Sequence, residues 1–236
     1  IIENIIPNNI IECLLSEYDT LRPDDFDEEI DELPSSSDIS ISTCQQKLQY
    51  IHAPMIIKYI LSNIILSSNN NTNKKTFGYL IYLTYLIQYC NFLFSTHKNK
   101  VTEESLLEQK WHPNIHIRRY IIQTYTARRK FNDVTFFQAS KIQLDKLVLV
   151  IIVICLVLGN YRVHLETLAK ELGISINRIM TLAKETGCKV EKRNNQTGAE
   201  EEMEELQTGG GSGWIAKLVY PIKFPSHIRG RTNSRK

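Results

Sequence analysis

The sequence predicts a mainly α-helical protein with small β-hairpins, in which two compact units follow an acidic, largely irregular linker. Three observations support this prediction. Apolar residues recur at three- and four-residue spacings through much of residues 44–190. Glycines and prolines interrupt this periodicity where helices would end or begin. Acidic residues gather near the N-terminal end, in a segment with too few apolar residues to fold alone.

The charge of the chain is unevenly distributed. Its 236 residues carry a formal net charge of +2, from 28 basic and 26 acidic residues. Residues 1–38 contain twelve acidic residues and one arginine, a net charge of −11, which leaves +13 for the remainder. The near-neutral total therefore conceals an acidic segment beside a basic body, a distribution typical of proteins that face a polyanion.

Composition excludes several classes of protein. Hydrophobic residues make up 42% of the chain, enough for a packed core. The apolar run 147–158 is shorter than the roughly 20 residues of a membrane-spanning helix, so it predicts a buried core helix. The five cysteines form no CxxC motif, which predicts free thiols in a reducing compartment. The first residue is Ile, and no leader pattern follows it, so we expect part of a longer chain without a signal peptide.

Residues 1–43 are predicted to form the acidic linker. Residues 19–42 are acidic and then serine-rich, and they contain Pro23 and Pro34. The scattered apolar residues before them could dock on another surface. The opposing interpretation is a solvated linker with no role of its own.

A first unit is predicted over residues 44–140. Its helices are expected at residues 44–66, 77–94 and 115–125, and a short strand near residues 134–137. Pro54 suits an early turn of the first helix, and Pro113 precedes the third. The polar, low-complexity run 67–73 predicts a loop.

A second unit, residues 141–225, has a clearer pattern, and a basic tail follows at residues 226–236. The predicted order is a helix over residues 144–158, an extended step at 162–163, helices at 165–172 and 176–186, and strands at 188–192 and 214–220. Gly159, Gly173 and Gly187 end helices, and Ser175 caps the last one. This order is that of a winged helix, a helix-turn-helix motif with an added β-hairpin.

The last helix of this unit is a candidate contact with DNA. Arg178 and Lys184 could reach phosphates, and Asn177 and Thr181 could touch base edges, whereas Glu185 would oppose DNA. The face is only mildly basic, which favours contact with the DNA backbone over sequence reading. The hairpin connection, residues 194–213, contains five glutamates and is expected to point away from DNA.

Further basic residues complete the predicted DNA-binding set. They are Lys98, Lys100, Arg118, Arg119, Arg128, Arg129, Lys130, Lys192 and Arg193. Arg118 and Arg119 are expected to be exposed, opposite Ile117 on their helix. The three bases from Arg128 follow that helix, where positive charge also favours the helix dipole without any ligand. Their joint excess nevertheless favours a polyanion partner.

No catalytic motif is recognisable in the sequence. His112 and His116 have a metal-compatible spacing, but Pro113 lies between them and favours a loop that enters a helix. The glycines at 209–213 lack the Lys-Ser/Thr pair of a phosphate-binding loop. We therefore expect a non-catalytic protein without a metal or cofactor.

The chain resembles the C-terminal part of the forty-nine-kilodalton-class subunit of the RNA polymerase I-specific heterodimer. The matching stretches are Asp145-Lys146-Leu147 with the apolar helix, residues 160–168, Leu172-Gly173-Ile174-Ser175 up to Met180, Ala183-Lys184 and Lys189-Val190. Weaker support comes from residues 79–94 and 113–126, and Ile5-Ile6-Pro7 with the acidic stretch is similar to the family's linker.

The resemblance implies a tandem winged-helix module, similar to that of the initiation factor TFIIE, with the first winged helix in residues 44–140. It implies a subunit of RNA polymerase I, in the nucleus and nucleolus, that binds double-stranded DNA without sequence preference. Initiation, promoter clearance and elongation of ribosomal RNA synthesis would depend on it. The family's TFIIF-like dimerisation domain, and with it the contact to the heterodimer partner, is expected to lie outside this chain. The alternative is a winged-helix protein-interaction module, as in cullin or vesicle-sorting assemblies.

Overall fold

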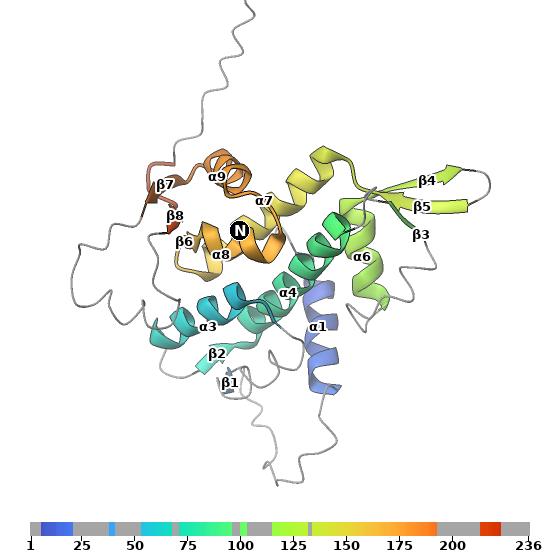
Figure 1. Cartoon of the computed structure of the whole chain (residues 1–236). Coiled ribbons are helices and arrows are strands. Elements are labelled where there is room, and N and C mark those ends of the chain that lie inside the picture. The colour runs from blue at the N-terminus through green and yellow to red at the C-terminus, as the bar shows by residue number, and fades with distance from the viewer. Residues whose placement is uncertain are drawn as a thin grey trace, which may run out of the picture.

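The protein is mainly helical, with small antiparallel sheets, as predicted (Figure 1). The computed structural model describes residues 6–20, 38–40, 53–67, 71–95, 100–102, 115–131, 134–192 and 213–222. The helices there are α1 (Asn8–Thr20), α3 (Met55–Ser67), α4 (Lys74–Ser95), α6 (Ile115–Tyr125), α7 (Lys141–Leu158), α8 (Leu165–Leu172) and α9 (Ile176–Glu185). The strands are β1 (Asp38–Ser40), β2 (Asn71–Asn73), β3 (Lys100–Thr102), β4 (Ala127–Phe131), β5 (Val134–Gln138), β6 (Arg162–His164), β7 (Lys189–Lys192) and β8 (Trp214–Lys217).

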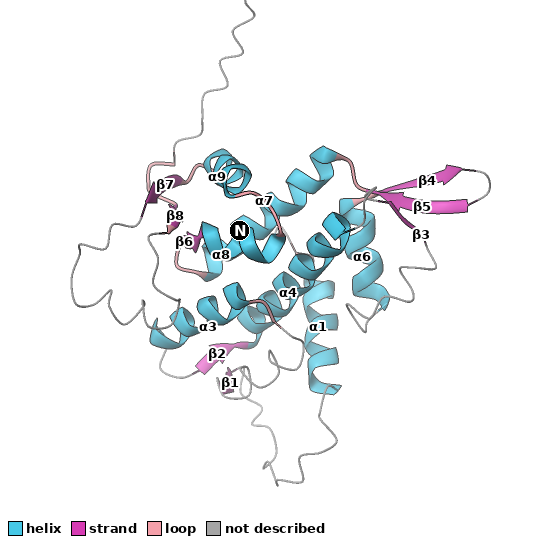
Figure 2. Cartoon of the chain, viewed as in Figure 1, coloured by secondary structure: helices cyan, strands magenta, loops and turns pink. Residues whose placement is uncertain are grey.

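Two three-stranded sheets lie at opposite ends of the helical body (Figure 2). One has the strand order β3-β5-β4 and the other β6-β8-β7, and all their pairs are antiparallel. In each sheet the first strand in sequence therefore pairs with the third. Strands β1 and β2 form a separate two-stranded ladder.

One hydrophobic core runs through the body, and α4 and α7 pack against each other at its centre. Phe77, Tyr82 and Tyr89 of α4 are fully buried. The stretch Lys75–Phe94 is long and apolar enough to cross a membrane, but 78% of it is buried inside the protein, as in a core helix. Burial also raises the pKa of the Cys90 and Cys155 thiols to about 12.

The structure corrects the prediction of a largely irregular linker for residues 8–20, which form α1. Ile10, Ile11 and Leu14 are buried, so this part of the acidic segment docks on the body. The approach is close at Gly78 of α4, where an added Cβ would lie 3.2 Å from Cγ2 of Ile11. Of the two interpretations that the sequence left open for these apolar residues, the structure favours docking, here on the body of the same chain. Residues 21–37 lie outside the described residues.

The first unit contains three strands that the sequence did not predict, β2, β3 and β4. Asn71, Thr72 and Asn73, expected in a loop, form β2 and pair with β1. Arg128, Arg129 and Lys130 lie in β4, although they were expected at the end of a helix. The predicted helix α6 and the predicted strand β5 are confirmed.

The second unit follows its predicted order closely. A capping box at Ser140 and Gln143 starts α7 three residues earlier than the apolar pattern indicated. Gly173 adopts the left-handed conformation, with φ of 61°, and ends α8 as expected. Ser175 occupies the N-cap position of α9, but its side chain makes no capping hydrogen bond.

Helix α3 belongs to the first unit by sequence but packs on α8 of the second. The Tyr59 hydroxyl lies 2.8 Å from Nε2 of His164, and the two rings meet edge to face with centroids 4.5 Å apart. The backbone N–H of Met55 donates to the Glu171 carboxylate at 2.8 Å. Polar contacts therefore join the two units alongside the shared core.

Candidate nucleic-acid interface

The β4–β5 hairpin extends away from the helical body (Figure 2). It carries the longest run of consecutive basic residues in the chain. Arg128, Arg129 and Lys130 are all exposed. Their cross-strand partners are Phe137, Phe136 and Thr135, in that order. Because side chains alternate along a strand, Arg129 lies on the opposite face from the other two. The hairpin therefore presents positive charge on both faces.

Helix α6, which precedes this hairpin, places its two arginines differently from the prediction. Arg119 is exposed, but Arg118 is only 7% exposed, so the expectation that both face solvent is wrong. Arg118 precedes Ile122 by four residues and Tyr125 by seven, and all three therefore lie on the buried face of the helix. Burial lowers the pKa of the Arg118 guanidinium. This arginine is held inside the body and does not contribute to a phosphate-binding surface.

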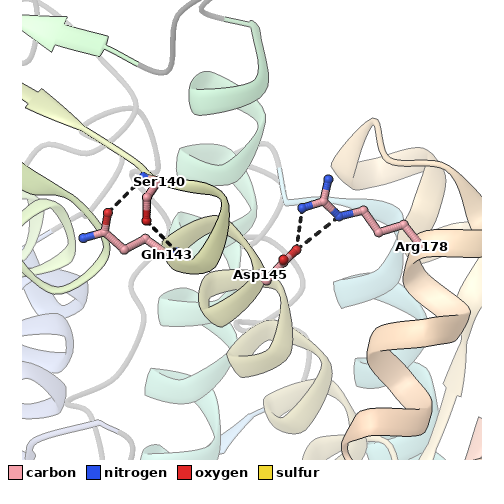
Figure 3. A network of polar contacts seen from close by, with 4 residues as sticks. All are labelled: Ser140, Gln143, Asp145 and Arg178. Atoms are coloured by element: carbon pink, nitrogen blue, oxygen red, sulfur yellow. Dashed lines mark hydrogen bonds and ion pairs between the residues drawn. The ribbon is translucent and has the colours of Figure 1, made fainter. Parts of the chain in front are cut away.

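Helix α9 presents Asn177, Thr181, Lys184 and Glu185 to solvent, as predicted. Arg178 differs from the prediction, because its guanidinium turns to Asp145 on α7 and forms an ion pair (Figure 3). Its Nε lies 3.1 Å from Oδ1 of Asp145, and Nη2 contacts the same oxygen. The ion pair ties α9 to α7 and partly neutralises the arginine.

Asp145 lies near the start of α7, which begins with a capping box. The Ser140 hydroxyl accepts from the Gln143 N–H at 3.3 Å, and the Gln143 side chain accepts from the Ser140 N–H at 2.9 Å (Figure 3). Between α7 and α9 lies a shallow depression of about 250 Å³, lined by Lys141, Asp145, Arg178, Thr181, Leu182 and Glu185. Two cations face two carboxylates there, so this surface has little net attraction for phosphate.

The remaining predicted residues are scattered or lie outside the described residues. Lys192 is exposed at the end of β7, opposite Trp214. Lys100 is the first residue of β3 and pairs with Gln138, and its side chain lies outside the description. Lys98 and Arg193 lie entirely outside it. The structure thus brings Arg128, Arg129 and Lys130 together, and does not gather the full predicted set on one face.

Sequence reasoning missed a second group of cations, on the β6–β8–β7 sheet. Arg162 lies opposite Lys217 on the neighbouring strand, and Lys217 lies opposite Lys189. Three basic residues therefore form one row across three strands. The first and last of these residues are 55 positions apart, and 21 residues (193–213) separate β7 from β8. Only the register of the sheet aligns them, and no spacing in the sequence reveals that register.

Comparison with known proteins places the chain in a family. No curated protein matches it closely enough to add a relative. Residues 2–225 match the family model described as A49-like RNA polymerase I associated factor, which spans nearly the whole chain and both sheets. The chain therefore belongs to the A49-like RNA polymerase I associated factor family, a family of non-catalytic polymerase subunits.

Proposed function

We propose that this chain is a DNA-binding module of RNA polymerase I, which contacts double-stranded DNA without sequence preference. In this role it supports initiation, promoter clearance and elongation of ribosomal RNA synthesis in the nucleus and nucleolus. Its family supports an association with RNA polymerase I. The observation that carries DNA binding is the run of three exposed basic residues, Arg128, Arg129 and Lys130, on the projecting β4–β5 hairpin.

The repeated strand order supports a tandem winged-helix arrangement. In a winged helix, one helix precedes the first strand and two helices in a helix-turn-helix follow it. The last of these helices leads into a hairpin whose last strand pairs with the first strand. The series α7, β6, α8, α9, β7, β8 has this order. The series α4, β3, α6, β4, β5 has the same strand order and the same helix before its hairpin, and residues 103–114, between β3 and α6, lie outside the described residues. We accordingly assign the first winged helix to residues 44–140 and the second to residues 141–225.

Sequence-independent contact is favoured by the types of residue exposed. Arginine and lysine bind phosphates wherever they lie along the duplex, whereas reading a base needs a matched donor and acceptor pattern. The neutral polar side chains that α9 exposes are Asn177 and Thr181, and the Thr181 hydroxyl already donates to the backbone carbonyl of Asn177 at 2.9 Å. Arg178 is engaged with Asp145. Lys184 remains as a backbone contact, with Arg119 and Lys192 as further candidates.

The test is a DNA titration of the full chain with Arg128→Glu, Arg129→Glu and Lys130→Glu combined. On random duplexes we expect affinity at about 100 mM salt to fall at least about 10-fold, equally for unrelated sequences, with a shallower salt dependence. The charge-matched control combines Lys58→Glu, Lys146→Glu and Lys170→Glu, three exposed lysines of α3, α7 and α8. Wild-type chain that does not bind at low salt would overturn the proposed function. Unchanged affinity of the hairpin variant would remove the hairpin from the interface.

A second function, docking of a protein partner, is favoured by apolar residues at the exit of β8. Val219, Tyr220 and Ile222 are 51%, 91% and 46% exposed, and Tyr161 beside them is 51% exposed. The Leu218 N–H donates to the Tyr161 carbonyl at 3.0 Å, which holds this exit against the end of α7. Other RNA polymerase I subunits are the expected partners. Cross-linking from position 220 within the assembled polymerase would identify the subunit, and the absence of any cross-link would argue against docking there.

A further inference from the structure

The two faces of the β6–β8–β7 sheet differ: Val163 and Ala216 are buried on one, and most of the charged residues lie on the other. Val163 and Ala216 are 1% and 0% exposed on the side toward the helices. Side chains alternate along a strand, so Arg162, Lys217 and Lys189 all point to the other side. Arg162 is exposed, and the side chains of Lys217 and Lys189 are 37% and 68% exposed. The outer face thus carries a row of three solvent-accessible cations, hereafter the cation row.

Like charges directly opposite each other weaken a sheet, and adjacent strands lie only about 4.8 Å apart. The cation row contains two such pairs in succession, Arg162 with Lys217 and Lys217 with Lys189. Nothing in the packing of the inner face requires charge at these positions. Repulsion within the cation row is offset only in part inside the chain, and a bound polyanion would offset the rest.

One acidic residue on the same face partly offsets the cation row. Glu191 forms an ion pair with Lys189, and its Oε2 lies 3.8 Å from Nζ of Lys217. Hydrogen bonding from Lys189 and the charge of the two lysines hold the pKa of Glu191 below its usual value. Three cations face one carboxylate, so a net positive charge remains. The carboxylate lies on the β7 side, which leaves the Arg162 end the more positive.

The position of Arg162 is set by the turn before it. Asn160 and Tyr161 adopt left-handed conformations, with φ of 52° and 63°. A Cβ at Gly159 would lie 2.6 Å from the Arg162 carbonyl oxygen, so only glycine allows this close approach. The turn therefore delivers Arg162 to the start of β6 in a defined register, and the cation row does not depend on a mobile loop.

We infer that the cation row is a second binding site for the phosphodiester backbone of duplex DNA, separate from the β4–β5 hairpin. The inference rests on the proposed function, since it assumes that the chain binds DNA. The two sites lie at opposite ends of the body (Figure 2), so each contacts a different stretch of a bound duplex. Glu191 lowers the affinity of the site, because it competes with phosphate for Lys189 and Lys217.

The test compares three variants of the full chain by fluorescence anisotropy on a labelled random duplex over a range of salt. Arg162→Gln, Lys189→Gln and Lys217→Gln combined should weaken binding about 10-fold or more, and lower the salt slope by about 0.9 for each phosphate that the protein no longer neutralises. The control Lys58→Gln, Lys146→Gln and Lys170→Gln has the same net charge and should change the affinity less than about 2-fold. Glu191→Gln should tighten binding about 2- to 3-fold, a gain that misfolding cannot produce.

The outcomes separate this inference from the proposed function. If the hairpin variant loses affinity while the cation-row variant keeps the wild-type affinity and salt slope, the second site is wrong and DNA binding stands. If the wild-type chain does not bind duplex DNA, both fail. A loss in the cation-row variant that the control reproduces would also overturn the site. Thermal melting of each variant excludes unfolding as the cause. The cation-row variant should melt at or above the wild-type temperature, because it removes the like-charge pairs from the sheet.

Discussion

The two three-stranded sheets share a strand order but present their positive charge in different ways. In the β3-β5-β4 sheet three basic residues follow one another along β4, on a hairpin that extends from the body. In the β6-β8-β7 sheet three basic residues lie side by side on neighbouring strands, and Glu191 offsets part of their charge. The same topology thus supports two surfaces with different origins. A run along one strand is visible in the sequence, whereas a row across strands depends on register.

The helices before the two hairpins show a parallel contrast. Both α6 and α9 carry an arginine that the sequence predicted to be accessible. Arg118 of α6 is buried within the body, and Arg178 of α9 is paired with Asp145. In both cases the tertiary structure uses the arginine internally. The positive charge available to a polyanion therefore lies more on the strands than on these helices.

The largest expected effect tests whether the two regions unfold together. Ile121 of α6 and Ile179 of α9 are both 0% exposed and belong to one core. Replacing either by Ala should lower the free energy of unfolding by about 2–5 kcal/mol. Because the core is shared, each variant should shift a single transition, measured by urea denaturation with both circular dichroism and fluorescence. Two separable transitions, each sensitive to only one substitution, would contradict the shared core.

An intermediate effect concerns pH and tests the buried tyrosines of α4 and α6. Burial raises the pKa of Tyr125 to about 12, and it also raises the pKa of Tyr82 and Tyr89. An unfolded tyrosine ionises near pH 10, so above that pH the unfolded chain releases protons that the folded chain retains. Stability is therefore fully present below about pH 10 and should fall as the pH rises toward 12, by about 1.4 kcal/mol per pH unit for each such group.

The measurement is the melting temperature of the wild type and of Tyr125→Phe from about pH 8 to about pH 11.5. This range includes the ordinary tyrosine pKa of about 10. The phenylalanine variant should lose less stability across this window. A pH dependence identical to that of the wild type would show that Tyr125 does not contribute to the alkaline transition.

The smallest expected effect concerns the Asp145–Arg178 ion pair. Both side chains are about one-third exposed, at 28% and 34%, so solvent screens the pair. A double-mutant cycle with Asp145→Ala and Arg178→Ala should give a coupling energy of about 0.5–1 kcal/mol. Asp145→Asn should also release Arg178 toward solvent and tighten duplex binding slightly. A coupling energy near zero would mean that the pair does not hold α9 against α7.

Much of the second unit could be predicted from local pattern. The apolar periodicity of α8 and α9, and the glycines at 159, 173 and 187, set the helix ends within a few residues of those observed. These signals are local, because a helix face and a left-handed C-cap depend on neighbours only a few positions away. The first unit was predicted less completely. Strand β4 has three consecutive basic residues at its centre, without the alternation of apolar and polar residues typical of a strand, and becomes a strand through pairing with β5.

The candidate site divides in the same way. The bases at 128–130 and their exposure follow from a local run, and the prediction that they form part of a basic surface could be made without coordinates. The burial of Arg118 was not predictable from its charge, since residues 117, 118, 121, 122 and 125 form a wider buried face than the apolar residues alone indicate. The cation row could not be predicted from the sequence, because no local signal sets the register between β6, β7 and β8.

By itself the sequence determined the mainly helical class, the acidic and basic halves of the charge, the order of elements in the second unit and the family resemblance. These properties depend on composition and on spacings of a few residues, and both can be read directly from the sequence. Only the tertiary structure decided which charges face solvent, that residues 8–20 dock on α4, and that Arg162, Lys189 and Lys217 share one row. These depend on contacts between segments distant in the sequence, where packing and strand register, and not local preference, set the position of each side chain.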